Sequence, residues 1–311
     1  MQKTMHPDSA LSWADIQLFL AAARARSGSQ AARRLELDQA TVSRRLRALE
    51  RTLGQSLFKR GPYGHALTDA GRTMLAQAEA MEAAALGIQS RLSEDRAALG
   101  GTLRIAGPEA FLCSYLAPRL GALRRAHPAL ELQLVPMPHL MSVSRREIDI
   151  AITVNEVPEG RAVTRKLTDY TLGLFAAAPY LAEHGSPSSV SQLTNHALVG
   201  YIDDLIVMRA LDYLDEIHPG LRPALQSASI LAQRAMTGAG LGIGMLPHYL
   251  TAECPEFVSI LPEQVRLTRS YWIVAHADTK DLPIHRTVID YIVQQVNMDR
   301  SYFAPPADRV I

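Results

Sequence analysis

The chain has 311 residues, of which 48% are hydrophobic and 20% charged, and its formal net charge is +1. These values are ordinary for a globular protein of two or three domains, and no apolar run approaches the ~18–20 residues that span a bilayer. The first 15 residues lack the apolar core of a signal peptide, and the two cysteines, Cys113 and Cys254, lie far apart. We therefore expect a cytoplasmic protein without a membrane partner, a disulfide framework or a zinc site.

The charge is distributed unevenly along the chain. Residues 1–67 carry eleven Lys and Arg against five Asp and Glu, a net charge of +6. The remaining residues carry 21 cations and 26 anions, a net charge of −5. A basic end on an acidic body indicates a polyanionic partner for that end alone.

The first expected elements are short helices. Four apolar residues recur at i, i+3, i+4 and i+7, the spacing of one helix face: Ile16, Phe19, Leu20 and Ala23. Ser29 can cap a second helix, "QAARRL", and Asp38 can cap a third that begins at Gln39. Because only "ELD" separates these two helices, their spacing predicts a helix-turn-helix.

The third helix has two distinct faces. Apolar residues recur along one side at spacings of four, three and four: Val42, Leu46, Leu49 and Leu53. At ~100° per residue, small and basic residues point the other way: Ala40, Ser43, Arg44, Arg47 and Arg51. A solvated basic face is the alternative interpretation. The short turn, the small alanines and the local positive charge favour entry into a DNA groove.

We predict a DNA-binding surface on the second and third helices and on the segment that follows them. Gln39 would pair with adenine and Arg44 with guanine, whereas Thr41 and Ser43 would meet phosphate, a base or a thymine methyl group. The start of the second helix and the later cations would contact the phosphate backbone. The predicted surface comprises Ser29, Gln30, Arg33, Arg34, Gln39, Ala40, Thr41, Ser43, Arg44, Arg47, Lys59 and Arg60.

A wing and a long helix are expected next. Leu57-Phe58 and Ala66-Leu67 are predicted strands on either side of the turn signal "GPYG". From Thr68 onward, apolar residues alternate steps of four and three over about three heptads: Met74, Ala78, Met81, Ala85, Ile88 and Leu92. Alanine and methionine bury little surface, so a plain packed helix is the alternative. We favour a dimerising helix, because a two-fold protein can grip two half-sites one DNA turn apart.

An alternation of strands and helices begins at Gly101. The order is strand "TLRIA", helix "PEAFLCSYLAPRLGALRRAHP", strand "LELQLVP", segment "SVSRREI" and strand "DIAITV", which predicts a mostly parallel sheet. Further strands are expected at 172–178, 197–202, 224–229, 243–247 and 271–276, before a last helix, "DLPIHRTVIDYIVQQV". Cys113 is expected to be a small core residue, and the tail 301–311 is expected to be loose.

Signatures of catalysis are missing from the sequence. "GAGLGIGM" is rich in glycine, but it lacks the G-x-G-x-x-G spacing and leads into "LPHYL" instead of opening a dinucleotide fold. There is no P-loop, H-E-x-x-H, G-x-S-x-G or paired-cysteine motif. We therefore predict that the protein is not an enzyme and has no catalytic residue, no cofactor and no metal site.

Together these residues resemble the LysR-type transcriptional regulators over nearly the whole chain. The resemblance is most specific in residues 16–71, through "IQLFLAAA", "GSQAARRLELDQATVSRRLRALERTLGQSLFKR" and "LTDAG". It is looser later, through "GTLRIA", "LAPRLGAL", "REIDIAIT" and "GAGLGIGMLPHYL". The resemblance implies an all-α winged helix-turn-helix at 1–67, a dimerising linker helix at 68–98, and an α/β effector domain at 101–300 similar to a periplasmic binding protein. One lobe would comprise 101–169 and 271–300, the other 170–270.

The resemblance also implies a function and partners. The protein would be a sequence-specific DNA-binding transcriptional regulator that binds double-stranded DNA and a small-molecule effector between the lobes. It would form a homodimer through the linker helix, assemble as a homotetramer and act on RNA polymerase. The competing class is an α/β small-molecule binding protein or enzyme whose N-terminal segment only mediates oligomerisation. The effector, the operator and the direction of regulation stay open.

The sequence departs from the family pattern at three places. Ala40 stands where Pro is frequent in the recognition helix, and the wing tip, 61–65, lacks the arginine often found there. Pro108 stands where the family often has a hydroxyl residue that holds a carboxylate ligand, and Glu109 adds a negative charge. Both residues are ordinary helix starters. The alternative is that this loop binds no small anion, so that the effector is neutral, cationic or carries its anion elsewhere.

Loops that match those of the family provide the candidate effector contacts, although each taken singly also fits a scaffold role. They lie after the first three strands and in the second lobe. The candidates are Gly107, Pro108, Glu109, Pro136, Met137, Pro138, His139, Val154, Asn155, Tyr201, Ser227 and Ala228.

Overall fold

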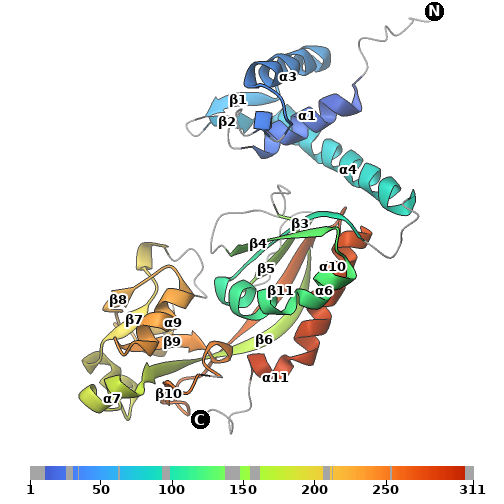
Figure 1. The fold of residues 1–311 in the computed structure, drawn as a ribbon. Coiled ribbons are helices and arrows are strands. Elements are labelled where there is room, and N and C mark those ends of the chain that lie inside the picture. Colours follow the sequence, from blue (N-terminus) through green and yellow to red (C-terminus); the bar gives the residue numbers. More distant parts are fainter. Residues whose placement is uncertain are drawn as a thin grey trace, which may run out of the picture. The chain divides into compact units, whose positions relative to one another are not determined.

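The structure, a computed structural model, describes residues 11–25, 31–33, 35–61, 64–92, 99–136, 148–154, 162–205, 211, 213–252 and 254–304. The chain divides into two compact units, Met1–Glu94 and Asp95–Ile311 (Figure 1). None of the described helices is long and apolar enough to cross a membrane. Across the described ranges, His, Cys, Asp and Glu side chains form no group of three or more that could hold a metal ion.

The N-terminal unit consists of helices and one small sheet. Its elements are α1 (Trp13–Arg24), helical residues 31–33, α3 (Gln39–Leu53), β1 (Phe58–Gly61), β2 (Gly64–Leu67) and α4 (Asp69–Leu92). The Ser12 hydroxyl accepts a hydrogen bond from Asp15 N (3.2 Å) and so caps α1. Residues from four segments share one core: Ile16, Phe19, Leu20, Leu49, Leu57 and Ala78. The predicted apolar face of the first helix is therefore the face that packs.

The long helix α4 changes character along its length. Near its start, a Cβ added to Gly71 would lie 2.1 Å from Leu57 O, so the helix approaches the neighbouring segment as closely as only glycine allows. Ala78 is buried in the same core. Farther along the predicted seam, Met81 is 47% exposed and Ile88 58% exposed. The first part of the seam thus packs within its own unit, and the later part leaves apolar side chains at the surface.

The C-terminal unit is built on a mixed sheet. Its described strands are β3 (Gly101–Gly107), β4 (Leu130–Pro136), β5 (Ile150–Thr153), β6 (Ala162–Ala177), β7 (Leu198–Gly200), β8 (Leu225–Gln226), β9 (Ile243–Pro247), β10 (Phe257–Ile260) and β11 (Leu267–His276). Their order is β4-β3-β5-β11-β6-β9-β7-β8, with β10 also paired to β6. We call β4, β3 and β5 the first half of the sheet, and β9, β7 and β8 the second half.

The prediction of a mostly parallel sheet is correct only within each half. β3 runs parallel to β4 and β5, and β7 runs parallel to β8 and β9. Between the halves, β6 and β11 form a long antiparallel ladder, in which β11 pairs with β5 of the first half and β6 pairs with β9 of the second (Figure 1). The predicted strand 172–178 is only the second part of β6, and β10 was not predicted.

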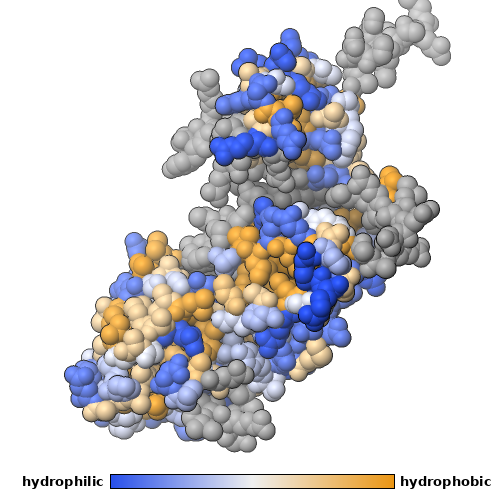
Figure 2. All heavy atoms as spheres, in the orientation of Figure 1, coloured by the Kyte–Doolittle hydropathy of each residue, from blue (hydrophilic) through white to orange (hydrophobic). Residues whose placement is uncertain are grey.

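Helices and short helical turns cover both halves of this sheet. In the described ranges they are η2 (Ala110–Leu116), α5 (Ala117–Arg119), α6 (Gly121–Ala126), α7 (Ala178–His184), η4 (Val190–Asn195), η5 (Asp203–Leu205), α8 (Tyr213–Ile217), α9 (Ile230–Gly238), η7 (His248–Leu250), α10 (Pro283–Met298) and α11 (Arg300–Phe303). Figure 2 shows hydrophobic side chains gathered over β4 and α6. A groove lies there, lined by Leu120, Gly121, Arg124, Pro128, Ala129, Leu130, Glu131 and Leu132.

The structure corrects two expectations about this unit. The start of the predicted loose tail forms α11, and Phe303 is fully buried, with its ring centroid 4.5 Å from that of Tyr115. Residues 305–311 lie outside the described ranges. Cys113 is exposed and not in the core, because Phe111, Leu112 and Tyr115 occupy the buried side of η2.

Candidate nucleic-acid interface and effector site

The helix α3 begins as its sequence predicts. Asp38 has extended backbone, and its carboxylate Oδ1 accepts a hydrogen bond from Thr41 N at 2.8 Å. Hydrogen bonds from the Thr41 side chain and backbone lower the pKa of Asp38, so the cap carries its full negative charge at neutral pH. At the other end, Gly54 has a φ of 64° and closes the helix in the left-handed conformation. The two caps hold the outward residues in a fixed register.

The outward face of α3 carries the predicted DNA contacts. Gln39, Ala40, Arg44 and Arg47 are exposed, while Thr41 and Ser43 are half-buried. Val42 and Leu49 are buried on the opposite side. Two shallow grooves follow the exposed face: one is lined by Gln39, Ala40, Ser43, Arg44 and Arg47, the other by Arg44, Arg47, Glu50, Arg51, Gly54, Gln55 and Ser56.

Two residues of α3 differ from a simple division by face. Leu53, assigned to the packed side, is 38% exposed, because it lies in the last turn, beyond the buried Val42 and Leu49. Arg45 does not belong to the outward set. Its Nη2 lies 3.3 Å from Asp15 Oδ1 and ties α3 to α1. Hydrogen bonding by Ser12, which outweighs partial burial, and the nearby Arg45 guanidinium lower the pKa of Asp15.

The second helix and the wing are described in part. Ala31 and Ala32 are buried, and Arg33 is exposed beside them. Lys59 is exposed on β1. Ser29, Gln30 and Arg34, together with the side chain of Arg60, lie outside the described residues.

Glu50 is a structural residue of this surface that the sequence analysis missed. Its Oε1 accepts hydrogen bonds from Leu57 N (2.7 Å) and Phe58 N (3.2 Å). These bonds hold the start of β1 against the last turn of α3. They thereby fix the position of the backbone that carries Lys59. In the sequence Glu50 is only one anion among many arginines, so no signal marks this role.

In the C-terminal unit, two predicted loops are joined by a side chain. A Cβ added to Gly107 would lie 2.9 Å from Ile152 Cβ, so β3 ends in close contact with β5. Glu109 follows, and its Oε2 accepts a hydrogen bond from Ser229 Oγ at 2.8 Å and lies 3.5 Å from Leu231 N. Ser229 is not among the predicted contacts, although Ser227 and Ala228 immediately before it are.

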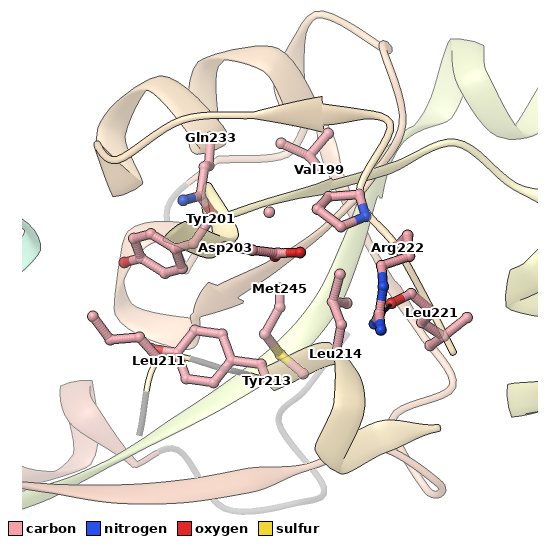
Figure 3. Close-up of a pocket in the computed structure, with 12 residues that line it drawn as sticks. Val199, Tyr201, Asp203, Leu211, Tyr213, Leu214, Leu221, Arg222, Gln233 and Met245 are labelled. Atoms are coloured by element: carbon pink, nitrogen blue, oxygen red, sulfur yellow. Dashed lines mark hydrogen bonds between the residues drawn. The ribbon is translucent and has the colours of Figure 1, made fainter. Parts of the chain in front are cut away.

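The predicted contact Tyr201 lies beside a small cavity of the second half. The cavity, about 20 Å³, is lined by Val199, Gly200, Tyr201, Asp203, Leu211, Tyr213, Leu214, Leu221, Arg222, Pro223, Gln233 and Met245 (Figure 3). This is room for about one water molecule. Burial and the negative charge of Glu109 raise the pKa of Tyr201, which places Tyr201 within the field of Glu109.

The remaining predicted effector contacts are more dispersed. Ser227 Oγ accepts from Ser229 N at 3.1 Å, which links it to the Glu109 contact. Val154 is buried in the core, and Pro136 is exposed at the end of β4. Met137, Pro138, His139 and Asn155 lie outside the described residues. Of the twelve candidates, the structure therefore brings Glu109, Tyr201 and Ser227 into one neighbourhood.

Two protein-family models match this chain. The model "Bacterial regulatory helix-turn-helix protein, lysR family" matches residues 13–72, and "LysR substrate binding domain" matches 96–297. The chain belongs to the LysR family. The regulator is 26% identical over 281 residues to the Mau operon transcriptional activator of Paracoccus denitrificans. The aligned residues cover 90% of this chain and 95% of that protein. It is 32% identical over 239 residues to the Escherichia coli regulator YhjC, over 76% of this chain and 75% of that one.

A solved structure has the same fold as the regulator. Full-length OxyR from Pseudomonas aeruginosa aligns with a TM-score of 0.70 and 20% identity, over 95% of this chain and 97% of that chain. The expected family, fold class and general function are thus confirmed: the regulator is a LysR-type DNA-binding transcriptional regulator with an effector-binding domain, in a family that is not enzymatic. The individual contact residues stay predictions.

Proposed function

We propose that the regulator reads its operator with the exposed face of α3 in the major groove. Gln39 and Arg44 would meet base edges, and Arg33, Arg47 and Lys59 would meet phosphates. One observation carries the proposal. Val42 and Leu49 are buried against the rest of the unit, whereas four predicted DNA contacts on α3 are exposed: Gln39, Ala40, Arg44 and Arg47. Ser29, Gln30, Arg34 and Arg60 join this surface by sequence spacing alone.

Equilibrium binding to DNA from upstream of the regulator's own gene tests the proposal. Arg44→Ala should lose about 1–3 kcal/mol of binding to the specific site and discriminate less against altered sites. Arg286→Ala is the matched control, because it removes one arginine that is 75% exposed from α10, in the other unit. Unchanged affinity and unchanged sequence preference in Arg44→Ala would contradict the docking. Affinity should fall steeply with salt as neutralised phosphates release counterions.

We further propose that the regulator is a homodimer through α4 and a homotetramer when bound to DNA. Met81 and Ile88 support the dimer, because both are large apolar residues exposed on one long helix. The hydrophobic surface over β4 and α6 is the proposed second contact (Figure 2). The assembled regulator would act on RNA polymerase in the cytoplasm. Ile88→Glu should shift the assembly to smaller species in analytical ultracentrifugation, whereas Met298→Glu, at another exposed apolar site, should not.

The effector is proposed to bind between the two halves of the large sheet. The domains would be 1–67 for DNA, 68–98 as linker and 101–300 for the effector, with lobes at 101–169 plus 271–300 and at 170–270. Gly107, Pro108 and Glu109 approach from the first half, and Tyr201, Ser227 and Ala228 from the second. Ligand binding would shift the population of lobe arrangements and so change how paired dimers bend DNA. Calorimetry with a panel of amines and carboxylates, followed by footprinting with each binder, tests this.

A further inference from the structure

One side chain links the two halves of the large sheet through a helix end. Glu109 stands at the start of η2, which packs on β3 and β4 of the first half. Ser229 caps α9, which packs on β9, β7 and β6. The 2.8 Å hydrogen bond from Ser229 Oγ to Glu109 Oε2 therefore joins segments 120 residues apart in the chain.

The carboxylate of Glu109 occupies the N-terminal turn of α9 as a bound anion would. Besides Ser229 Oγ, Leu231 N points toward the same oxygen at 3.5 Å. The Ser229 hydroxyl also accepts from Ala232 N at 3.1 Å, so one hydroxyl connects the helix end to the carboxylate. The first turn of a helix presents free N–H groups and a partial positive charge, which together favour an anion.

Among the described residues, no Lys, Arg or His lies within ion-pair distance of Glu109. The described groups that feel its charge are Tyr201 and Cys113, and burial together with the Glu109 carboxylate raises the pKa of each. Within the described ranges, the hydrogen-bond donors to the carboxylate are Ser229 Oγ and Leu231 N, and both belong to the opposite half of the sheet.

We infer that Glu109 is an internal occupant of the anion-binding end of α9, and that it selects against effectors that would place a carboxylate there. The inference rests on the proposed effector site between the halves and names its charge preference. While Glu109 is seated, an arriving carboxylate meets a like charge and a helix end whose donors are already used. A ligand at this place must therefore bring a neutral or a positively charged group. In the absence of a ligand, the same hydrogen bond between Ser229 and Glu109 also holds the two halves together.

Chemical rescue with acetate tests the inference on the full-length regulator. Glu109→Ala empties the place, and Glu109→Gln is the matched control, because its amide oxygen can still accept from Ser229 without carrying charge. Thermal unfolding and amide hydrogen exchange of residues 229–232 are measured with sodium acetate, with sodium chloride and with methylammonium chloride at equal ionic strength. Neither readout involves DNA, so failure here is separable from failure of the proposed DNA docking or effector response.

We expect acetate to raise the melting temperature of Glu109→Ala saturably and to restore slow exchange at residue 231, whose N–H points toward Glu109 in the wild type. Its apparent affinity should be at least about tenfold higher than for the wild type or Glu109→Gln, a difference of about 1.4 kcal/mol. Sodium and methylammonium chloride should give no such protection. Equal protection of all three proteins by acetate, or protection of none, would overturn the inference. Should Glu109→Ala not fold, Glu109→Ser empties most of the same place and carries the same expectation.

Discussion

The two units of the regulator build their functional surfaces in different ways. In the N-terminal unit, the proposed DNA contacts lie mainly on one helix, α3, whose two faces follow from residue spacing. In the C-terminal unit, Glu109, Tyr201 and Ser229 come from three segments that only the large sheet brings together. A surface on one helix is set by local periodicity, whereas a site between loops depends on every strand that positions them. Four predictions test this difference, from the largest expected effect to the smallest.

The stability of the C-terminal unit should depend strongly on α11, the last described helix of the chain. Phe303 is fully buried, and its ring contacts those of Phe111, Tyr115, Tyr249 and Tyr271. Phe303→Ala should therefore lower the free energy of unfolding by about 3–5 kcal/mol, measured by urea denaturation. Met298→Ala, at a site that is 63% exposed, should cost less than about 0.5 kcal/mol. Equal small losses would show that the end of the chain does not belong to this core.

In the N-terminal unit, the two ends of the leucine side of α3 should differ. Leu49 is buried with residues of α1 and α4, whereas Leu53 lies largely outside this core. Leu49→Ala should cost about 2–5 kcal/mol of stability, and Leu53→Ala, its matched control, about 1 kcal/mol or less. Thermal unfolding followed by circular dichroism compares the two. If Leu53→Ala were as damaging as Leu49→Ala, the simple division of α3 by face would be right after all.

Asp149, which immediately precedes β5, should make the free energy of unfolding depend on pH in the acid range. Burial would raise the pKa of Asp149. His285, whose Nε2 lies 3.6 Å from Asp149 Oδ1, and the hydrogen bond from Arg104 N (2.8 Å) outweigh burial, so the pKa is lowered. The folded-state pKa thus lies below the unfolded value of about 3.9. This stabilisation is complete above pH ~4 and is lost as the pH falls through the folded-state pKa.

Asp149→Asn should therefore flatten the acid side of the stability curve and cost about 1–3 kcal/mol at neutral pH. Urea denaturation between pH 3 and pH 7 measures both effects. Asp290→Asn is the control, because that side chain is 65% exposed. If the two variants lost stability in parallel with the wild type down to pH 3, the contacts of Asp149 with Arg104 N and His285 would not carry the acid dependence.

The smallest expected effect concerns the wing. Lys59 is exposed on β1, and we predict that it contacts a phosphate and not a base. Lys59→Ala should weaken specific and non-specific DNA about equally and reduce the slope of log K against log salt by about 0.9. Fluorescence anisotropy over a salt series measures the slope, with Arg286→Ala as the control. A change in sequence preference would instead place Lys59 at a base edge.

Much of the fold follows from local patterns in the sequence. Asp38 caps α3 as predicted, and the strands near 101–107, 130–136, 150–153 and 243–247 lie where apolar runs indicated them. The errors have a common cause. The first part of β6, "AVTRKLTDY", lacks a continuous apolar run because that stretch is only partly buried. Phe303 was assigned to a loose tail because the residues it packs against lie far away in the chain.

The candidate sites divide in the same way. The exposure of Arg44 and Arg47 follows from helical periodicity, since 3.6 residues per turn place them opposite Val42 and Leu49, and Gln39 is exposed as the first residue of the helix. The roles of Arg45 and Glu50 do not follow from it. A side chain that leaves its own helix to meet Asp15 or the start of β1 is positioned by packing between elements.

The sequence alone determined the family, the two-faced recognition helix and the charge contrast between the two ends of the chain, because each depends on residues close together or on composition. It also showed that Glu109 brings a negative charge to the start of the first helix of the effector domain. Only the tertiary structure decided that the Glu109 carboxylate is received by Ser229 at the start of α9. That pairing depends on the β6–β11 ladder that joins the two halves of the sheet, and contacts between distant segments are set by this topology and not by local spacing.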